Sequence, residues 1–192
     1  LAGIRAEGVS RCVVRRNRLR DTFFGIYLTE TTACTVEDND VAAHAVSETS
    51  SGNGIHLWNV AASRVRGNHV TGHRDGVYLE FVRDTEIVDN RSERNLRYGL
   101  HFMFSEGNTY ASNVFRENSA GVAVMYSKHV TMRANRFEDN WGPVAYGLLL
   151  KDISDSAIEG NVFRRNTTGI FAEGANRLQV TGNRFDRNGW AV

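Results

Sequence analysis

The stretch around His101 combines residue types that bind soft metal ions. His101 and Met103 stand two residues apart, so they project from the same face of any strand that contains them. Met125 follows Met103 by 22 residues. An imidazole with two thioethers suits Cu(I) better than zinc, magnesium or calcium, which prefer thiolate or oxygen ligands. These residues therefore predict a copper site, with Cu(I) as the favoured ion.

A second group of polar residues is suited to acid–base chemistry on a polysaccharide. The group consists of His73, Arg74, Asp75, Tyr78, Glu80 and His101. No pair of carboxylates flanks a single position, as a typical glycosidase requires. An ion pair between Arg74 and Asp75 in a turn explains the same residues without catalysis. A carbohydrate-active enzyme, of the uronan epimerase or lyase type, is therefore kept as an alternative hypothesis.

Both groups lie within a repeat that must position them. A Gly-apolar-x-apolar pattern returns eight times, mostly in steps of 22 residues, and it opens at Gly3, Gly25, Gly54, Gly76, Gly99, Gly121, Gly147 and Gly169. An asparagine stands 14 residues after every one of these glycines, at Asn17, Asn39, Asn68, Asn90, Asn113, Asn135, Asn161 and Asn183. This regularity is typical of a solenoid.

The content of each unit predicts strands rather than helices. Short alternating stretches rich in Val, Ile, Phe and Thr are cut by Gly, Asn and Asp, which allows three strands and three turns per unit. Leucine-rich repeats need more leucines per unit. The sequence therefore predicts an all-β fold, a right-handed parallel β-helix of about eight coils with about 22 residues per coil, as a single domain over residues 1–192. Stacked asparagine amides are expected to form hydrogen-bonded ladders along it.

In this fold the residues two and four positions after each opening glycine point outward. The middle of that outward stripe holds His56, Trp58, Tyr78 and Glu80 beside His101 and the two methionines. Contiguous exposed aromatic surface usually marks a binding site. His56 lies two coils before His101, about 10 Å along the axis, so it is suited to a transfer path rather than to the same ion. If another chain or a loop covers the stripe, the methionines serve only in packing.

Two insertions lengthen the repeat, one around residues 42–51 and one at residues 141–144. Both follow the third strand of a coil, so we expect them at one edge, where solenoids commonly contact partners. A third hypothesis is therefore a pure docking module, in which Trp58, Trp141 and Pro143 help to hold a partner and no metal binds.

Cys12 and Cys34 each lie nine residues after an opening glycine, so they should stack in adjacent coils. A ladder of small residues is favoured, because in-register neighbours rarely have the side-chain vectors of a disulfide. A disulfide and a metal clamp made of both thiols are the two alternatives.

Charge and hydropathy exclude some partners. With 23 Lys and Arg against 22 Asp and Glu, the net charge is +1, so no field is expected that would attract nucleic acid. No run of about 18 apolar residues is present, so direct membrane insertion is not expected.

Several segments resemble the NosD family, including GNGIHLWN (52–59), NLRYGLHFMFS (95–105) and RFEDNWGPVAYGLLLKDISDS (136–156). The resemblance implies a periplasmic β-helix protein without enzymatic activity of its own, which works with an ABC transporter membrane subunit. It further implies copper insertion into nitrous oxide reductase, with a copper chaperone as another partner. The family has more coils than this chain, so we expect the chain to be a fragment of a longer solenoid.

Overall fold

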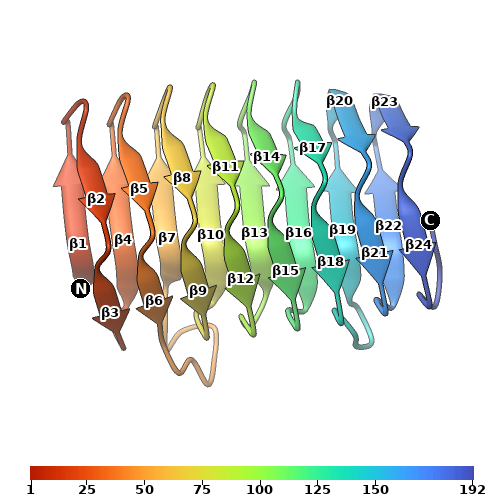
Figure 1. Ribbon diagram of the computed structural model, residues 1–192, viewed down its shortest axis with the longest axis horizontal. Coiled ribbons are helices and arrows are strands. Elements are labelled where there is room, and N and C mark those ends of the chain that lie inside the picture. The colour runs from red at the N-terminus through yellow and green to blue at the C-terminus, as the bar shows by residue number, and fades with distance from the viewer.

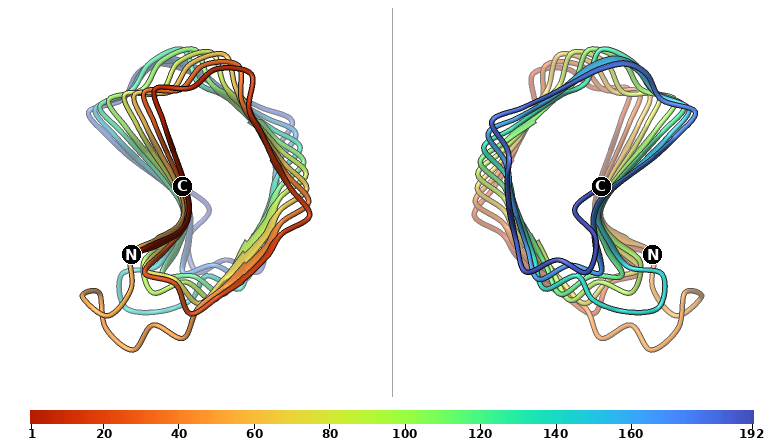
Figure 2. Two further views of the ribbon diagram at one scale, coloured as in Figure 1. Left: turned by 90° about the vertical axis from the view of Figure 1, so that its left-hand side faces the viewer. Right: turned by 90° about the vertical axis from the view of Figure 1, so that its right-hand side faces the viewer.

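The protein is a solenoid of parallel strands, described here by a computed structural model of residues 1–192. Eight coils stack side by side, and each contributes one strand to each of three eight-stranded sheets (Figure 1). Seen from the N-terminal side in the left view of Figure 2, the chain turns clockwise as it recedes, so the solenoid is right-handed. The predicted fold class is confirmed. No helix in the structure is long and apolar enough to cross a bilayer.

The first sheet carries the outward stripe. Its strands are β1 (Ala2–Glu7), β4 (Phe24–Thr29), β7 (Asn53–Trp58), β10 (Asp75–Glu80), β13 (Tyr98–Met103), β16 (Ala120–Met125), β19 (Tyr146–Lys151) and β22 (Thr168–Glu173). Each strand begins at the residue before an opening glycine, so the glycine pattern marks this sheet.

The other two sheets have shorter strands. The second sheet contains β2 (Val13–Arg15), β5 (Thr35–Glu37), β8 (Arg64–Arg66), β11 (Glu86–Val88), β14 (Thr109–Ala111), β17 (Thr131–Arg133), β20 (Ser154–Glu159) and β23 (Asn176–Thr181). The third sheet contains β3 (Arg18–Arg20), β6 (Asp40–Ala42), β9 (His69–Thr71), β12 (Arg91–Glu93), β15 (Val114–Arg116), β18 (Arg136–Glu138), β21 (Val162–Arg164) and β24 (Arg184–Asp186).

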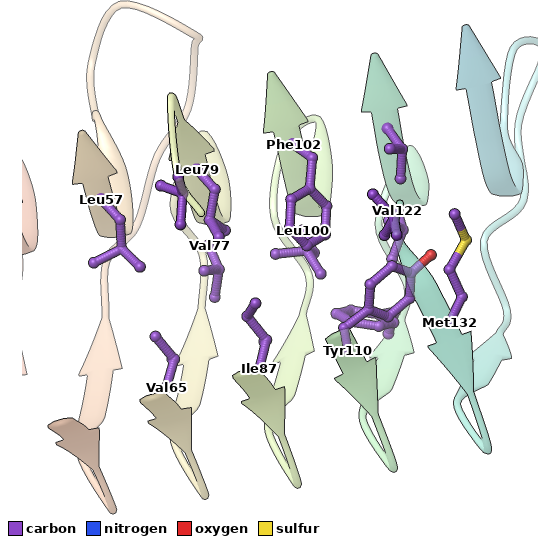
Figure 3. Packing of buried hydrophobic residues seen from close by; sticks show 14 of the residues in the cluster. Leu57, Val65, Val77, Leu79, Ile87, Leu100, Phe102, Tyr110, Val122 and Met132 are labelled. Carbon is purple, nitrogen blue, oxygen red and sulfur yellow. The ribbon is translucent and has the colours of Figure 1, made fainter. Parts of the chain in front are cut away.

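The core fills the interior of the coils. Figure 3 shows Leu79 and Phe102 of the first sheet facing Ile87 and Tyr110 of the second. A column of phenylalanine rings runs along the third sheet, from Phe115 through Phe137 and Phe163 to Phe185, with ring centroids 5.6, 4.5 and 5.0 Å apart. The opening glycines permit this close stacking. A Cβ at Gly99, for example, would lie 2.6 Å from the carbonyl oxygen of Gly121 in the next coil.

Two asparagine ladders join the coils. In the first, formed by the asparagines 14 residues after the opening glycines, each side chain donates from Nδ2 to the Oδ1 of the asparagine one coil further on, as from Asn113 to Asn135 at 3.0 Å. The second ladder runs through Asn95, Asn118, Asn140, Asn166 and Asn188 by the same Nδ2 to Oδ1 bonds, except that Asn118 donates to Oδ1 of Asn140 from its backbone N–H. Each amide also bonds to backbone groups, so the ladders satisfy turn donors and acceptors that would otherwise be buried without partners.

The two insertions form loops on the same edge of the solenoid, where the third sheet turns into the first (Figure 2). The first loop spans residues 43–52 and the second residues 139–145. Trp141 and Val144 at the second loop are 64% and 70% exposed. The prediction that both insertions share an edge is confirmed.

Cys12 and Cys34 form a disulfide between adjacent coils, with their Cα atoms 4.5 Å apart. The favoured prediction, a ladder of small residues with free thiols, was therefore wrong. Cys12 and Cys34 directly precede the paired strands β2 and β5, so the parallel register places them side by side in adjacent coils and brings their Cα atoms within the range a disulfide spans.

Candidate functional site

The register of the first sheet brings the predicted metal ligands together. Met103 of β13 pairs directly with Met125 of β16, and His101 lies two residues before Met103 on the same face. Phe102 between them is fully buried in the core. Both methionine side chains are half-buried, so their thioethers line the outer surface of two adjacent strands.

His101 is more enclosed than an outward stripe predicts, because only 6% of it is exposed. The rings of Tyr98 and Tyr78 pack against it at centroid distances of 4.7 and 5.1 Å. Ala123, its neighbour on β16, is small and fully buried. The expectation of an open solvent-facing stripe was thus wrong at this position, since side chains of neighbouring coils cover the imidazole.

Neither ring nitrogen of His101 has a hydrogen-bond partner. Such unsatisfied buried groups are uncommon and call for an explanation, one of which is a role in binding an ion. Nδ1 lies 3.6 Å from a carboxylate oxygen of Asp75, which is fully buried. Burial acts to raise the pKa of Asp75. The neighbouring His101 and the guanidinium of Arg97 nevertheless hold this pKa below its ordinary value.

An alternating column of tyrosines and histidines leads along the first sheet to His101. The rings of Tyr27, His56, Tyr78 and His101 follow one another at centroid distances of 4.5, 4.8 and 5.1 Å. His56 therefore lies two strands from His101, as the sequence predicts, and its Nδ1 is 3.0 Å from the Asn53 amide nitrogen. Burial and the positive charge of Arg74 lower the pKa of His56 to about 4. Burial and the negative charge of Glu80 raise the pKa of Tyr78 to about 12.

The predicted acid–base group is divided between the interior and the surface. His73 is fully buried beneath the first loop, where its Nδ1 is 3.2 Å from the hydroxyl oxygen of Ser51. Arg74 donates to Asn53 on β7, whereas Asp75 accepts two bonds from Arg97. The turn ion pair between Arg74 and Asp75 was therefore wrong, because each of the two side chains pairs with a residue of a neighbouring coil instead.

A row of exposed aromatic rings, not anticipated from the sequence, borders the methionines. Phe81, Phe104 and Tyr126 each follow the last residue of a first-sheet strand and are 45–46% exposed. Their rings stack nearly parallel, with centroids 5.5 and 5.2 Å apart, and Trp58 meets the row edge-on at 6.5 Å. All three have positive φ angles, of 49° to 55°, which is unusual for bulky residues. Other coils place Gly, Glu, Asn or Asp at this position, so the change to aromatic residues was a readable signal.

The residues predicted to hold a partner lie at two different edges. Trp58 and Glu80 end their strands beside the aromatic row, whereas Trp141 and Pro143 belong to the second loop at the opposite ends of the strands. A cavity of about 280 Å³ lies near the loops, lined by residues that include Glu48, Tyr98, Val144 and Tyr146. Tyr98, which lines this cavity, also packs on His101.

The side chains of His, Cys, Asp and Glu do not gather in groups of three or more that could hold a metal. The donor set on the first sheet is one imidazole and two thioethers, in register on two adjacent strands. These donors fit a soft ion such as Cu(I). We refer below to His101, Met103 and Met125 as the His–Met face.

The sequence of this chain is similar to that of known proteins. Residues 42–192 match the family model described as "Periplasmic copper-binding protein (NosD)". The chain is 41% identical over 71 residues to the probable ABC transporter binding protein NosD of Pseudomonas aeruginosa, covering 36% of this chain and 17% of that protein. It is 39% identical over 67 residues to the protein of the same name from Stutzerimonas stutzeri, covering 34% of this chain and 15% of that one. The matched segments thus span about one sixth of these curated relatives.

Solved structures share the fold. The periplasmic alginate epimerase AlgG superposes with a TM-score of 0.73 at 17% identity, over 91% of this chain and 49% of that one. The DFA-IIIase of Arthrobacter chlorophenolicus A6 without its lid superposes with a TM-score of 0.78 at 13% identity, over the whole of this chain and 55% of that one. At such identities the likeness shows the parallel β-helix and no more.

Proposed function

Because the chain belongs to the NosD family of periplasmic copper-binding proteins, we propose that it is part of a periplasmic accessory protein that handles Cu(I) on the His–Met face. Copper is cargo in this role rather than a resident cofactor. The protein would help to deliver it to nitrous oxide reductase, working with the membrane subunit of an ABC transporter and receiving it from a copper chaperone. The names of the curated relatives support the transporter link.

The observation that carries this proposal is the pairing of Met103 with Met125 beside an imidazole that has no partner. Residues in parallel register on adjacent strands are about 4.8 Å apart, which lets two thioethers reach one ion. Copper would bind one of the two ring nitrogens of His101, both of which lack a hydrogen-bond partner. His56, at the far side of Tyr78, offers a second imidazole along the same column for an ion in transit.

The aromatic row supports contact with a copper-carrying protein at this place. Transfer of a soft ion by ligand exchange requires donor and acceptor to touch, so a partner must approach Met103 and Met125. The surface it meets there is formed by Phe104 and Tyr126, which directly follow the two methionines in the chain. Exposed apolar surface of this kind is typical of interaction sites. Trp58 and Glu80 extend the contact to earlier coils, and Trp141 and Pro143 would serve a separate contact at the loops.

Anaerobic titration with Cu(I) against a competing chelator tests the site. We expect binding by the chain, and we expect the double substitution Met103→Ala and Met125→Ala to weaken it at least about tenfold, because both thioether donors are removed. Met132→Leu is the matched control, since Met132 lies fully buried in the core away from this face. Equal affinity in the double variant and the wild type would reject the His–Met face as the copper site.

Two other functions make different predictions. A carbohydrate-active enzyme is favoured by the burial of Asp75 beside His101, and turnover of a polyuronate by the chain would support it. A docking module without metal would retain apo-reductase in a pull-down regardless of copper and show no binding in the titration. The proposal expects no turnover and a copper-dependent pull-down.

A further inference from the structure

A buried carboxylate faces the imidazole of the His–Met face. Asp75 on β10 has no exposed surface, and its Oδ2 lies 3.6 Å from Nδ1 of His101 on the neighbouring strand β13. Arg97 donates to both carboxylate oxygens, from Nε at 3.0 Å and from Nη2 at 2.6 Å. A two-bond contact of this kind fixes the plane of the carboxylate as well as its charge.

This arrangement distinguishes the two neutral forms of the imidazole. A neutral ring carries one N–H and one lone pair. If the lone pair were on Nδ1, it would face an anionic oxygen and be repelled, whereas an N–H there is attracted. The present 3.6 Å is longer than a hydrogen bond, so the attraction of an Nδ1–H to the carboxylate is electrostatic at this distance. With the proton on Nδ1, the lone pair is on Nε2.

We propose that Asp75, held by Arg97, is a positioning residue that keeps the proton of His101 on Nδ1 and leaves the Nε2 lone pair free for a soft metal ion. The second half of this inference rests on the proposed function. Metal-binding histidines commonly donate their other ring N–H to a carboxylate, and removal of that partner typically costs about 10- to 100-fold in metal affinity. Asp75 touches no metal in this role and acts only through His101.

The protonation of His101 can be measured without any metal. In the ¹⁵N-labelled, metal-free chain at neutral pH, long-range ¹H–¹⁵N correlation spectra are expected to show His101 protonated at Nδ1. In Asp75→Asn, the amide can present an N–H to Nδ1, so we expect the proton to move to Nε2 and Cu(I) affinity to fall about tenfold or more. Asp139→Asn is the control, because Asp139 accepts two bonds from Arg165, which directly follows β21 of the third sheet, away from this face. It should alter neither quantity.

A less disruptive variant guards against loss of folding when the buried carboxylate is changed. Arg97→Lys retains the positive charge but cannot make both bonds. We expect it to give a mixture of the two ring forms and a smaller loss of affinity. A wild-type His101 protonated at Nε2 would overturn the inference, as would either variant that changes the ring form with Cu(I) affinity unaltered. A wild-type chain with Nδ1 protonated but no Cu(I) binding would instead overturn the proposed function and, with it, the metal half of the inference.

Discussion

Replacing Asn113 by Ala is expected to lower the free energy of unfolding by about 3 kcal/mol. The Asn113 side chain donates to the carbonyl oxygen of Ile87 at 2.8 Å and to Oδ1 of Asn135 at 3.0 Å. Its own Oδ1 accepts from the backbone and the side chain of Asn90, at 2.9 and 3.0 Å. All four bonds are buried; at about 0.5 kcal/mol net each they contribute about 2 kcal/mol, and partners left unsatisfied add about 1 kcal/mol more.

Urea unfolding followed by circular dichroism measures this effect. Asn17→Ala is the matched control, because Asn17 donates to Asn39 and to a nearby carbonyl oxygen but accepts no bond from a preceding asparagine. We expect its cost to be below about 1 kcal/mol. If Asn113→Ala cost no more than this control, the ladder would contribute little to stability.

Acidification from pH 6.5 to 4 is expected to destabilise the fold, with His73 as a main cause. Burial lowers the pKa of His73 from 6.5 to about 4, so the folded chain keeps this ring neutral through that interval while the unfolded chain takes up a proton. The free energy of unfolding therefore falls with falling pH in this window, by up to about 1.4 kcal/mol per pH unit for such a group. Above pH 6.5 both states are neutral and the stabilisation is complete. His56 has a similarly lowered pKa of about 4 and adds to the slope.

The substitution His73→Asn separates this titration from packing. His73 stands 19 residues after Gly54, at the offset where Asn95 follows Gly76, and its backbone N–H already donates to Oδ1 of Asn95. An asparagine there extends the second ladder by one member, so we expect the variant to fold and to lose stability less steeply between pH 6.5 and 4. Unfolding midpoints at pH 7.5 report packing, and the difference between pH 7.5 and 4.5 reports the proton. A slope equal to that of the wild type would contradict the assignment to His73.

The repeat made most of the scaffold predictable, because stacking identical coils converts a sequence offset directly into a spatial column. The asparagine ladder, the shared edge of the two insertions and the pairing of Met103 with Met125 all follow from that relation. The same relation could have identified His73 as a member of the second ladder. The residue type of His73 points to chemistry, whereas its offset points to the scaffold.

The offsets do not predict contacts between side chains that belong to different columns. The covering of His101 by Tyr98 depends on how the turn before β13 directs a ring back over its own strand. The partner of Asp75 is Arg97 in the next coil rather than its sequence neighbour Arg74. Such choices depend on rotamers and on local burial, which a pattern of residue types does not encode.

The regular stacking of the coils also fixes distances along the solenoid. Four coils separate the loop at residues 43–52 from the loop at 139–145, which corresponds to about 19 Å at the usual strand spacing. Because hydrogen bonding between strands fixes the spacing of successive coils, this span can change only by whole coils. A partner that contacts both loops is therefore held at a fixed distance from β13 and β16. The distance between the loops determines which partners can contact both of them.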